Sequence, residues 1–445
     1  MVRRTRRVDN NKKKNKRQQH NKKETGSLLW TILMLGVCFC MVDVLYLFFA
    51  SHTIPNYFEK NTSLKDRFSD RRELIKQQSN DNDNKNDNNP EKDTTKYEKK
   101  ERIFQILRSA GLGKELIKDG VKDKLPDWDD ITKRLGSDGP RIYGLETCED
   151  FRNSFDGDLK GAFLAVAGAF NSGTNLMAEL LIANCYNKKR YEYNKGLGIR
   201  WQVNWGKHTP PLKWRDNKEV VYPDAPPSEN TMPVVTIRDP YTWLQSMCVN
   251  RYATHWFHEV NYHCPNLIPN HVEHEFLPKA LDESYKYTRE DLHHKNPWLV
   301  DNIMNTANFT LHSKTVPVYV KYKKETINHE SLAHMWNEWY RQYYDAKFPK
   351  LIVRYEDLVF YAEEVTTTAC DCFGGTMKHK EFQYIGNSAK KGDIHMNKTS
   401  LIDNMLKFAS GTVNVTKGMT EEDLDFAKVV LDKEMMDFFN YQHPE

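Results

Sequence analysis

A turn of eight residues, Gly168 to Asn175, has the composition of an anion-binding loop. It reads GAFNSGTN and lies between a short apolar run and a helical pattern. Glycines at 168 and 173 let the backbone adopt conformations closed to other residues and let a ligand come close. The amides of the turn, with the first N–H groups of the following helix, would point toward one spot. We therefore expect this turn to bind a phosphate.

The residues that the turn lacks restrict the kind of phosphate compound. A nucleoside-triphosphate loop reads G-x-x-x-x-G-K-[ST], with its Lys on the phosphates and its hydroxyl on magnesium. Here the glycine spacing is the same, but Thr174 and Asn175 stand where Lys and Ser/Thr are needed. The pattern favours a phosphate that needs no metal over an ATP-using kinase site. A glycine-bearing turn without a ligand stays open as the alternative.

A second candidate anion site follows the apolar run Val234–Ile237. The stretch VVTIRDPYTWLQSM places Arg238 at a strand end, Pro240 at the start of a helix, and Ser246 in that helix. A guanidinium with a nearby hydroxyl can bind a phosphate monoester in bidentate fashion. The alternative is a structural ion pair of Arg238 with Asp239 or Glu356. Two anion sites at two strand ends suit a nucleotide with phosphates at both ends.

Alternating strand and helix patterns predict the architecture that brings these sites together. The strands expected are Phe163–Ala167, Pro233–Ile237 and Leu351–Arg354, and a helix with an aromatic core face is expected over Glu330–Tyr344. This alternation predicts an α/β fold with a doubly wound parallel sheet flanked by helices. Ligands of such a sheet bind at the carboxyl ends of its strands.

The N-terminal residues predict a membrane anchor. Residues 1–26 contain eleven Lys/Arg and form a basic tail, and Leu28 to Ala50 is apolar and long enough to span a bilayer. The basic flank orients the 27–50 span as a type II signal anchor with the tail in the cytosol. Residues 51–100 read as a disordered stem, 101–140 as a helical stem extension, and 141–445 as one lumenal domain. This topology argues against nucleic acid as the partner of the basic tail.

The cysteines and glycosylation motifs agree with a lumenal domain. Six cysteines follow the predicted span, and they allow fifteen full pairings among which the sequence does not choose. Asn61, Asn308, Asn397 and Asn414 each begin an N-glycosylation motif. Five histidines between residues 255 and 274 invite a metal hypothesis, but the segment reads better as a packed lid. We predict no metal site.

The two anion-binding motifs resemble those of the sulfotransferases, which use 3′-phosphoadenosine-5′-phosphosulfate (PAPS). AGAFNSGTNL is similar to the 5′-phosphosulfate loop of that family, which implies cofactor contacts at Asn171, Ser172, Gly173, Thr174 and Asn175. TIRDPYTWLQSM is similar to the 3′-phosphate segment, with Arg238 and Ser246 matching its ligands. Asn387 to Gly392 resembles, loosely, the basic loop over the 3′-phosphate, which implies contacts at Lys390, Lys391 and Gly392. The resemblance implies the P-loop-kinase-like sulfotransferase fold, and the topology is similar to that of Golgi carbohydrate sulfotransferases.

One position departs from the family pattern. The family usually places Lys or Arg directly before Ser/Thr-Gly-Thr, where this chain has Asn171. A neutral amide supplies no charge to the leaving phosphate, and a charge-assisted hydrogen bond is about twice as strong as a neutral one. Either another cation substitutes, or the enzyme is slow, or the protein is a catalytically silent binder. If charge is what the site lacks, Asn171→Lys raises turnover.

The segment WGKHTPP provides candidate catalytic groups between the two motifs. It resembles the Lys-Thr-His-Leu-Pro stretch of soluble sulfotransferases, with the intervening residue missing. His208 has a suitable intrinsic pKa for a base, and Lys207 could supply the charge that Asn171 does not. The alternative is a pair of exposed residues before a Pro-Pro turn.

These inferences together predict sulfuryl transfer from PAPS to a hydroxyl or amine of a glycan, without a metal, in the Golgi membrane. The glycan acceptor is implied by the resemblance in topology and not by particular residues, and tyrosine sulfation of proteins stays open. The other functional class is a catalytically silent glycan-binding or scaffold protein with the same fold.

Overall fold

The computed structural model describes residues 97–113, 120–217, 225–256, 263–270, 314–323, 325–389, 400–409 and 414–444. The predicted span of residues 27–50 and the stem to residue 96 lie outside this part of the chain. No helix within the described ranges is both long and apolar enough to cross a membrane.

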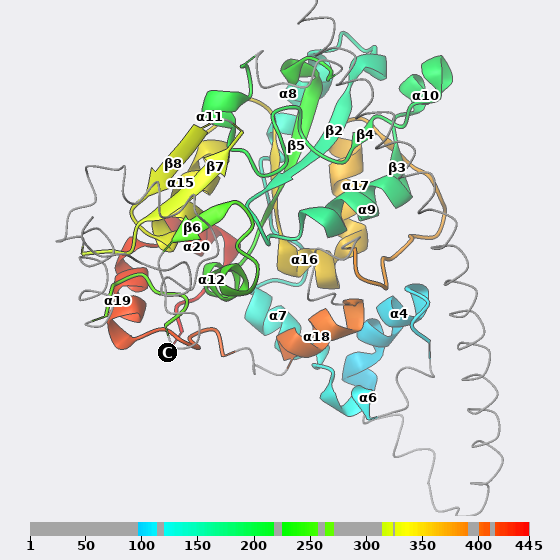
Figure 1. The fold of residues 1–445 in the computed structure, drawn as a ribbon. Helices are drawn as coiled ribbons and strands as arrows, with labels where there is room; N and C mark the ends of the chain where they lie inside the picture. Colours follow the sequence, from blue (N-terminus) through cyan, green and yellow to red (C-terminus); the bar gives the residue numbers. More distant parts are fainter. Residues whose placement is uncertain are drawn as a thin grey trace, which may run out of the picture. The chain divides into compact units, whose positions relative to one another are not determined.

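A mostly parallel sheet of five strands forms the centre of the fold (Figure 1). Its order is β1-β9-β5-β2-β4, with β1 antiparallel to β9 and the other neighbours parallel. The strands are β1 (Ile142–Tyr143), β2 (Phe163–Gly168), β4 (Ile199–Arg200), β5 (Thr231–Ile237) and β9 (Leu351–Arg354). The three strands expected from sequence are confirmed as β2, β5 and β9, which lie side by side.

Alternate residues of the central strands face two separate hydrophobic clusters. Ala165 and Val235 pack on the side that holds α12 (Pro240–Val249) and α15 (Leu332–Tyr344). Leu164 and Val234 pack on the opposite side, with α9 (Thr174–Asn184) and α17 (Ala362–Cys372). The aromatic stripe expected for α15 is confirmed as core, because Trp336, Trp339, Tyr340 and Tyr343 are all buried. Helices on both faces explain why the strands are apolar runs rather than alternating patterns.

The remaining elements surround this centre. Two small antiparallel sheets pair β3 (Cys185–Tyr186) with β10 (Thr376–Met377), and β6 (Thr254–Trp256), β7 (Val318–Tyr322) and β8 (Glu325–His329) in that order. The other helices are α4 (Glu101–Ser109), α6 (Val121–Lys124), α7 (Trp128–Leu135), α8 (Thr147–Asn153), α10 (Lys188–Asn194), α11 (Pro211–Trp214), α16 (Tyr355–Phe360), α18 (Leu401–Ala409), α19 (Glu421–Val430) and α20 (Lys433–Phe439), with short 3-10 helices at Glu98–Lys100, Leu159–Gly161 and Ser228–Asn230.

The segment predicted as a helical stem extension, residues 101–140, contains α4, α6 and α7. Their apolar faces, with Ile103, Leu107 and Ile131 fully buried, pack in one cluster with Phe360 of α16 and Met405 of α18. These helices lie together at the lower end of the view in Figure 1. The extension therefore shares a hydrophobic cluster with helices of the main domain.

Three disulfides select one pairing from the fifteen that the sequence allows. They join Cys148 to Cys372, Cys185 to Cys370, and Cys248 to Cys264. The first two fix α17 to α8 and β3, across separations of 224 and 185 residues. The third fixes the end of α12 to the segment that precedes β7.

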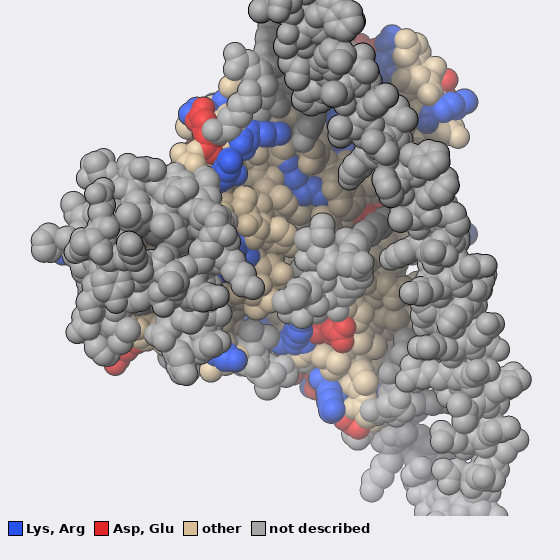
Figure 2. All heavy atoms as spheres, viewed as in Figure 1, with Lys and Arg blue, Asp and Glu red and all other residues tan. Residues whose placement is uncertain are grey.

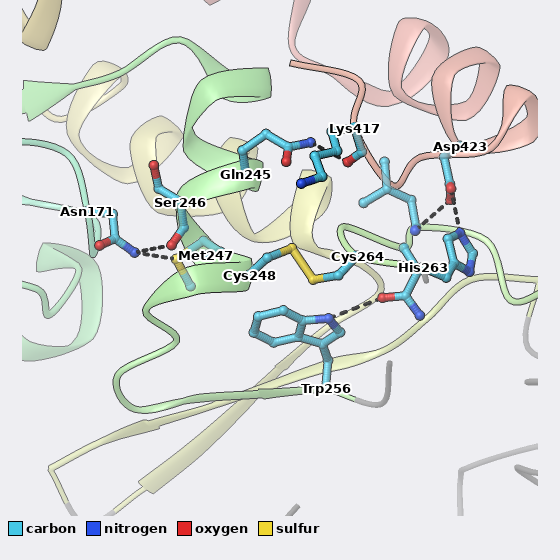
Figure 3. Close-up of a disulfide and its surroundings, with 12 residues drawn as sticks. Asn171, Gln245, Ser246, Met247, Cys248, Trp256, His263, Cys264, Lys417 and Asp423 are labelled. Atoms are coloured by element: carbon cyan, nitrogen blue, oxygen red, sulfur yellow. Dashed lines mark hydrogen bonds and ion pairs between the residues drawn. A yellow bond between two sulfur atoms is a disulfide. The ribbon is translucent and has the colours of Figure 1, made fainter. Parts of the chain in front are cut away.

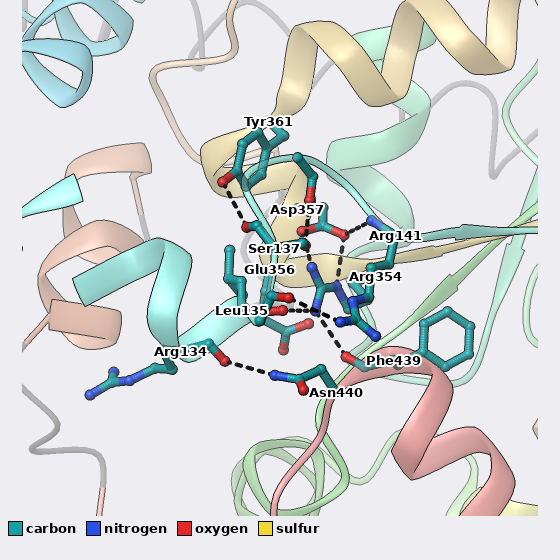
Figure 4. Close-up of polar contacts among 12 residues, drawn as sticks. Arg134, Leu135, Ser137, Arg141, Arg354, Glu356, Asp357, Tyr361, Phe439 and Asn440 are labelled. Carbon is teal, nitrogen blue, oxygen red and sulfur yellow. Dashed lines mark hydrogen bonds and ion pairs between the residues drawn. The ribbon is translucent and has the colours of Figure 1, made fainter. Parts of the chain in front are cut away.

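A buried ion pair organises the turn after β9. The Arg354 guanidinium donates to both carboxylate oxygens of Asp357 at 2.7 Å, and its Nη1 donates to the backbone oxygens of Leu135 and Phe439 at 2.9 Å (Figure 4). Asp357 also accepts from the N–H of Arg141. Each oxygen and nitrogen in this buried pair has a partner, as such pairs require. The start of α16, at Tyr355 to Asp357, is thus held in place through backbone oxygens of α7 and α20.

Candidate functional site

The two predicted anion sites lie next to each other. β2 and β5 are parallel neighbours with Gly168 opposite Thr236, so the loops that follow them leave the same edge of the sheet. A cavity of about 1160 Å³ opens there. Its walls include the following predicted site residues: Asn171, Gly173, Thr174, Asn175, Lys207, His208, Arg238 and Ser246.

The loop after β2 has its shape because two glycines allow it. A Cβ atom at position 168 would lie 2.4 Å from Thr236 Oγ1, and one at 173 would lie 2.3 Å from the Tyr355 ring. Gly173 also has φ +92°, a conformation that other residues rarely adopt. The predicted ligand Ser172 is fully buried, where its hydroxyl donates to Ala169 O at 2.8 Å and lies 2.9 Å from Thr236 Oγ1. The Ser172 side chain therefore bonds within the loop and to β5, and it does not line the cavity.

The start of α9 provides the anion-binding groups of this loop. α9 is 11 residues long and begins at Thr174, so the N–H groups of Gly173, Thr174 and Asn175 have no partner within the described residues. Unpaired N–H groups at a helix N-terminus, reinforced by the helix dipole, attract a negative charge. The backbone, rather than a cation of the loop itself, thus forms the first anion site.

Arg238 forms the second anion site with Ser246. Its Nη1 donates to Ser246 Oγ at 2.9 Å and to Asn171 O at 3.1 Å, and its guanidinium carbon lies 4.8 Å from the centre of the Tyr355 ring. Its buried Nε has no hydrogen-bond partner among the residues described. Among the described residues, Arg238 forms no ion pair with Asp239 or Glu356. The alternative interpretation of Arg238 as part of a structural ion pair is therefore wrong. Arg238 itself lines the cavity, although its Nε is buried.

Two carboxyl groups near Arg238 have other partners. Asp239 Oδ1 accepts from the N–H of Thr242 at the start of α12, and Glu356 accepts from the N–H of Asp239 and from the Tyr441 hydroxyl. Burial, with the charge of Asp239, raises the pKa of Glu356 to about 7. Glu356 is therefore protonated in weakly acidic solution, where it does not repel an anion.

Lys207 approaches the start of α9 from a separate segment. Its Nζ donates to Asn175 Oδ1 at 3.0 Å and lies 3.6 Å from the centre of the Trp201 ring. The side chain is only 6% exposed, and this burial lowers the pKa of Lys207 to about 7. The alternative of an exposed loop lysine is wrong. Lys207 brings to the loop a cation whose charge depends on pH.

His208 lies against the same loop, with one ring nitrogen engaged. Nδ1 is 2.8 Å from Gly168 O, which can only accept, so Nδ1 carries the proton and Nε2 is the basic atom. The ring packs on Phe170 at a centroid distance of 4.7 Å and is half-buried. Burial first, and the neighbouring Lys207 charge, lower the pKa of His208 to about 4. The imidazole is therefore neutral near pH 7, and with a pKa of about 4 it is a weaker base than the intrinsic pKa of histidine suggests.

Asn171 uses its side chain within the protein. Nδ2 donates to Asn250 O at 2.7 Å, just past the end of α12. It also donates to Ser246 O at 3.3 Å, a contact drawn in Figure 3. Its amide donors therefore point toward that helix rather than toward a bound anion. The other predicted cofactor contacts, Lys390, Lys391 and Gly392, lie outside the described residues.

The histidine segment is partly described. His263 Nε2 is 2.7 Å from Asp423 Oδ2, and the other oxygen of Asp423 accepts from the N–H groups of Leu267 and Ile268. His255 lies in β6. No group of His, Cys, Asp and Glu fit to hold a metal ion occurs within the described residues. His263 is thus the partner of a carboxylate of α19.

Further cavity residues were not predicted from sequence. Tyr355, Trp201 and Tyr252 line the cavity beside the predicted site, and Tyr252 stacks on Phe170. Tyr355 begins α16, directly after the predicted strand β9, and nothing in the sequence near Trp201 or Tyr252 marks them. On the face drawn in Figure 2, the basic side chains that are described are interspersed with acidic and uncharged residues.

Comparisons of the chain with models of protein families, with curated proteins and with solved structures find no match.

Proposed function

We propose that the protein transfers a sulfuryl group from PAPS to a hydroxyl or amine of a glycan. The observation that carries the proposal is the cavity at the ends of β2 and β5, into which both anion sites open. The start of α9 suits the 5′-phosphosulfate, and Arg238 with Ser246 suits the 3′-phosphate. These sites use backbone N–H groups, a guanidinium and a hydroxyl, which need no metal.

The groups beside the loop fit the chemistry of the transfer. PAPS supplies the sulfuryl group, whose sulfur is attacked by the acceptor oxygen or nitrogen while the bond to the 5′-phosphate breaks. Nε2 of His208 accepts the acceptor's proton, since Nδ1 is held by Gly168 O. The N–H groups at the start of α9 and the Lys207 ammonium stabilise the negative charge that develops on the leaving phosphate. Lys207 thereby replaces the cation that position 171 lacks.

A second candidate function is supported by Asn171 itself. A protein without a basic residue in the loop could retain the cavity as a catalytically silent binder of glycans. Transfer of labelled sulfate from PAPS onto a panel of glycans and tyrosine peptides, in the presence of EDTA, decides between the two. Transfer to a glycan supports the enzyme. Glycan binding without any affinity for adenosine 3′,5′-bisphosphate would refute it.

We also propose that the protein is a single-pass type II protein of the Golgi membrane with its catalytic domain in the lumen. The three disulfides support this proposal, because disulfides persist in oxidising compartments. Protease added to intact microsomes should spare the domain, and an N-glycosidase should increase its gel mobility. Digestion of the domain in intact microsomes would refute the topology.

A further inference from the structure

Asn171 occupies an unusual position at the junction of the two anion sites. Its backbone has φ +60°, a left-handed conformation in which Asn is more common than most residues. Its Nδ2 lies 2.7 Å from Asn250 O and 3.3 Å from Ser246 O, and 3.3 Å from the sulfur of Met247. The side chain of the phosphate loop is thereby joined to the end of α12.

The partners fix which way the amide points. Both oxygens are backbone carbonyls, which only accept hydrogen bonds, so the NH₂ group and not the oxygen must face them. An amide nitrogen has two hydrogens, and three acceptors within the protein share them: these two carbonyls and the Met247 sulfur. The oxygen that remains cannot donate to a phosphate. Asn171 is therefore not a side-chain ligand of an anion in this arrangement.

The carbonyls that Asn171 binds belong to the end of a helix. α12 ends at Val249, with Asn250 as its C-cap. Ser246 O already accepts from the N–H of Asn250, and Asn250 O accepts from Asn171 Nδ2. The same helix end is fixed on its far side by the Cys248–Cys264 disulfide, next to the His263–Asp423 pair (Figure 3).

The contacts around Asn171 form a closed circuit. Its side chain binds α12, α12 carries Ser246, Ser246 Oγ accepts from Arg238 Nη1, and the same Nη1 donates to Asn171 O. Asn171, a residue of the loop between β2 and α9, thus contacts both α12 and Arg238. Displacement of the loop would move both.

We propose that Asn171 is a positioning residue that holds the two anion sites at a fixed spacing before the ligand binds. The inference rests on the proposed function, because it assumes one ligand that spans both sites. Preorganisation of this kind increases affinity because less ordering remains to be done on binding. A lysine at 171 would lose both carbonyl bonds and place an unfavourable side chain at φ +60°. The geometry therefore reverses the expectation that Asn171→Lys raises turnover.

Three variants of position 171 test this role. Asn171→Gly keeps the backbone conformation and removes the amide, Asn171→His keeps one N–H donor in a residue that tolerates this conformation, and Asn171→Lys adds charge. Lys195→Gly is the matched control, since Lys195 has φ +62° and does not line the cavity. Calorimetry with adenosine 3′,5′-bisphosphate measures affinity, and amide hydrogen exchange of the ligand-free proteins measures order in residues 171–175 and at the end of α12.

We expect Asn171→Gly to weaken bisphosphate binding by up to about thirtyfold, the worth of two neutral hydrogen bonds of about 1 kcal/mol each. Asn171→His should recover part of that loss, and Asn171→Lys should not. The loss from Asn171→Gly should be smaller when Arg238 is already Ala, because the circuit is then open. A residue needed only for stability would lower the melting temperature without this coupling. Exchange should be faster in the loop and at the end of α12, and the control should match the native protein.

Two results would overturn the inference: native affinity and native exchange in Asn171→Gly, or tighter binding by Asn171→Lys. Native protein that binds no bisphosphate would instead refute the proposed function. The exchange data of the ligand-free variants would still decide the role of Asn171 in that case. Faster exchange confined to the loop and the end of α12 would support it, and unchanged exchange would refute it.

Discussion

In the proposed function, the loop between β2 and α9 and the segment between β5 and α12 bind an anion by different means. The first uses backbone N–H groups, and its cation, Lys207, comes from another segment and has a pKa lowered to about 7. The second has its own cation, Arg238, whose Nη1 donates to Ser246 Oγ. Both segments follow buried parallel strands. They differ in the groups that they offer to an anion: backbone N–H groups in the first and a guanidinium side chain in the second.

This difference separates anchoring from chemistry within one cavity. The Arg238 end offers a guanidinium to a group that does not change during the reaction. The Lys207 end offers a cation whose pKa is lowered to about 7, beside a neutral imidazole, and in the proposed reaction the negative charge of the leaving group develops there. The following predictions test the separation, since substitutions at one end should affect turnover and at the other end affinity.

The largest expected effect is on turnover at the His208 end. His208→Ala should lower kcat by about 10²–10⁴-fold, the usual contribution of a general base, with bisphosphate affinity close to native. His255→Ala is the matched control, because His255 also has a pKa lowered to about 4 by burial but does not line the cavity. Sulfate transfer and calorimetry on the same preparations measure both quantities. Near-normal turnover by His208→Ala would place the base elsewhere.

The next effect is on affinity at the Arg238 end. Arg238→Ala should weaken bisphosphate binding by about 2–4 kcal/mol, the scale for losing one partner of a desolvated charge pair. Ser246→Ala should cost about 1 kcal/mol, the worth of a neutral hydrogen bond. Arg238→Lys keeps the charge and loses the planar fork, so its affinity should lie between those of Ala and Arg. Native affinity in a correctly folded Arg238→Ala protein would contradict the assignment of the second site.

The sequence predicted the elements whose signals are local. Phe163–Ala167, Pro233–Ile237 and Leu351–Arg354 are unbroken apolar runs, and each forms a central strand. The glycines of the loop mark a turn by their spacing alone, and Arg238 with Ser246 is a pairing eight residues apart along one strand and helix. Neighbouring residues suffice to define each of these features.

The sequence did not predict features that depend on contacts between distant segments. Lys207 meets Asn175 across 32 residues, and Asn171 meets Asn250 across 79. From the sequence, we interpreted Asn171 as a weak substitute for a cation. The sequence gives the residue type, but the hydrogen-bond partners of Asn171 are known only from the structure. The disulfide pairing is similar, because the spacing of Cys148 and Cys372 gives no sign of a bond that folding brings together.

The last prediction is a pH dependence that distinguishes the two ends. Two groups of the ligand-free cavity titrate near pH 7: Lys207 loses its positive charge as the pH rises, and Glu356 gains a negative one. Both changes disfavour an anion, so bisphosphate affinity and kcat/KM should fall above about pH 7, by up to about tenfold per pH unit for each group that must hold its proton. His208, with a pKa of about 4, stays neutral over this range and adds nothing.

Two substitutions assign this pH dependence to its group. Lys207→Arg keeps its charge at high pH, so the fall should lessen if Lys207 causes it. Glu356→Gln keeps acceptors and donors for the N–H of Asp239 and the Tyr441 hydroxyl but cannot ionise, so it should lessen the part due to Glu356. Since Lys207 lies beside the bond that breaks, we expect Lys207→Arg to flatten kcat/KM more than bisphosphate affinity, and Glu356→Gln to flatten affinity as much as kcat/KM. Equal responses of both quantities to both variants would show that the two ends of the cavity do not divide anchoring from chemistry.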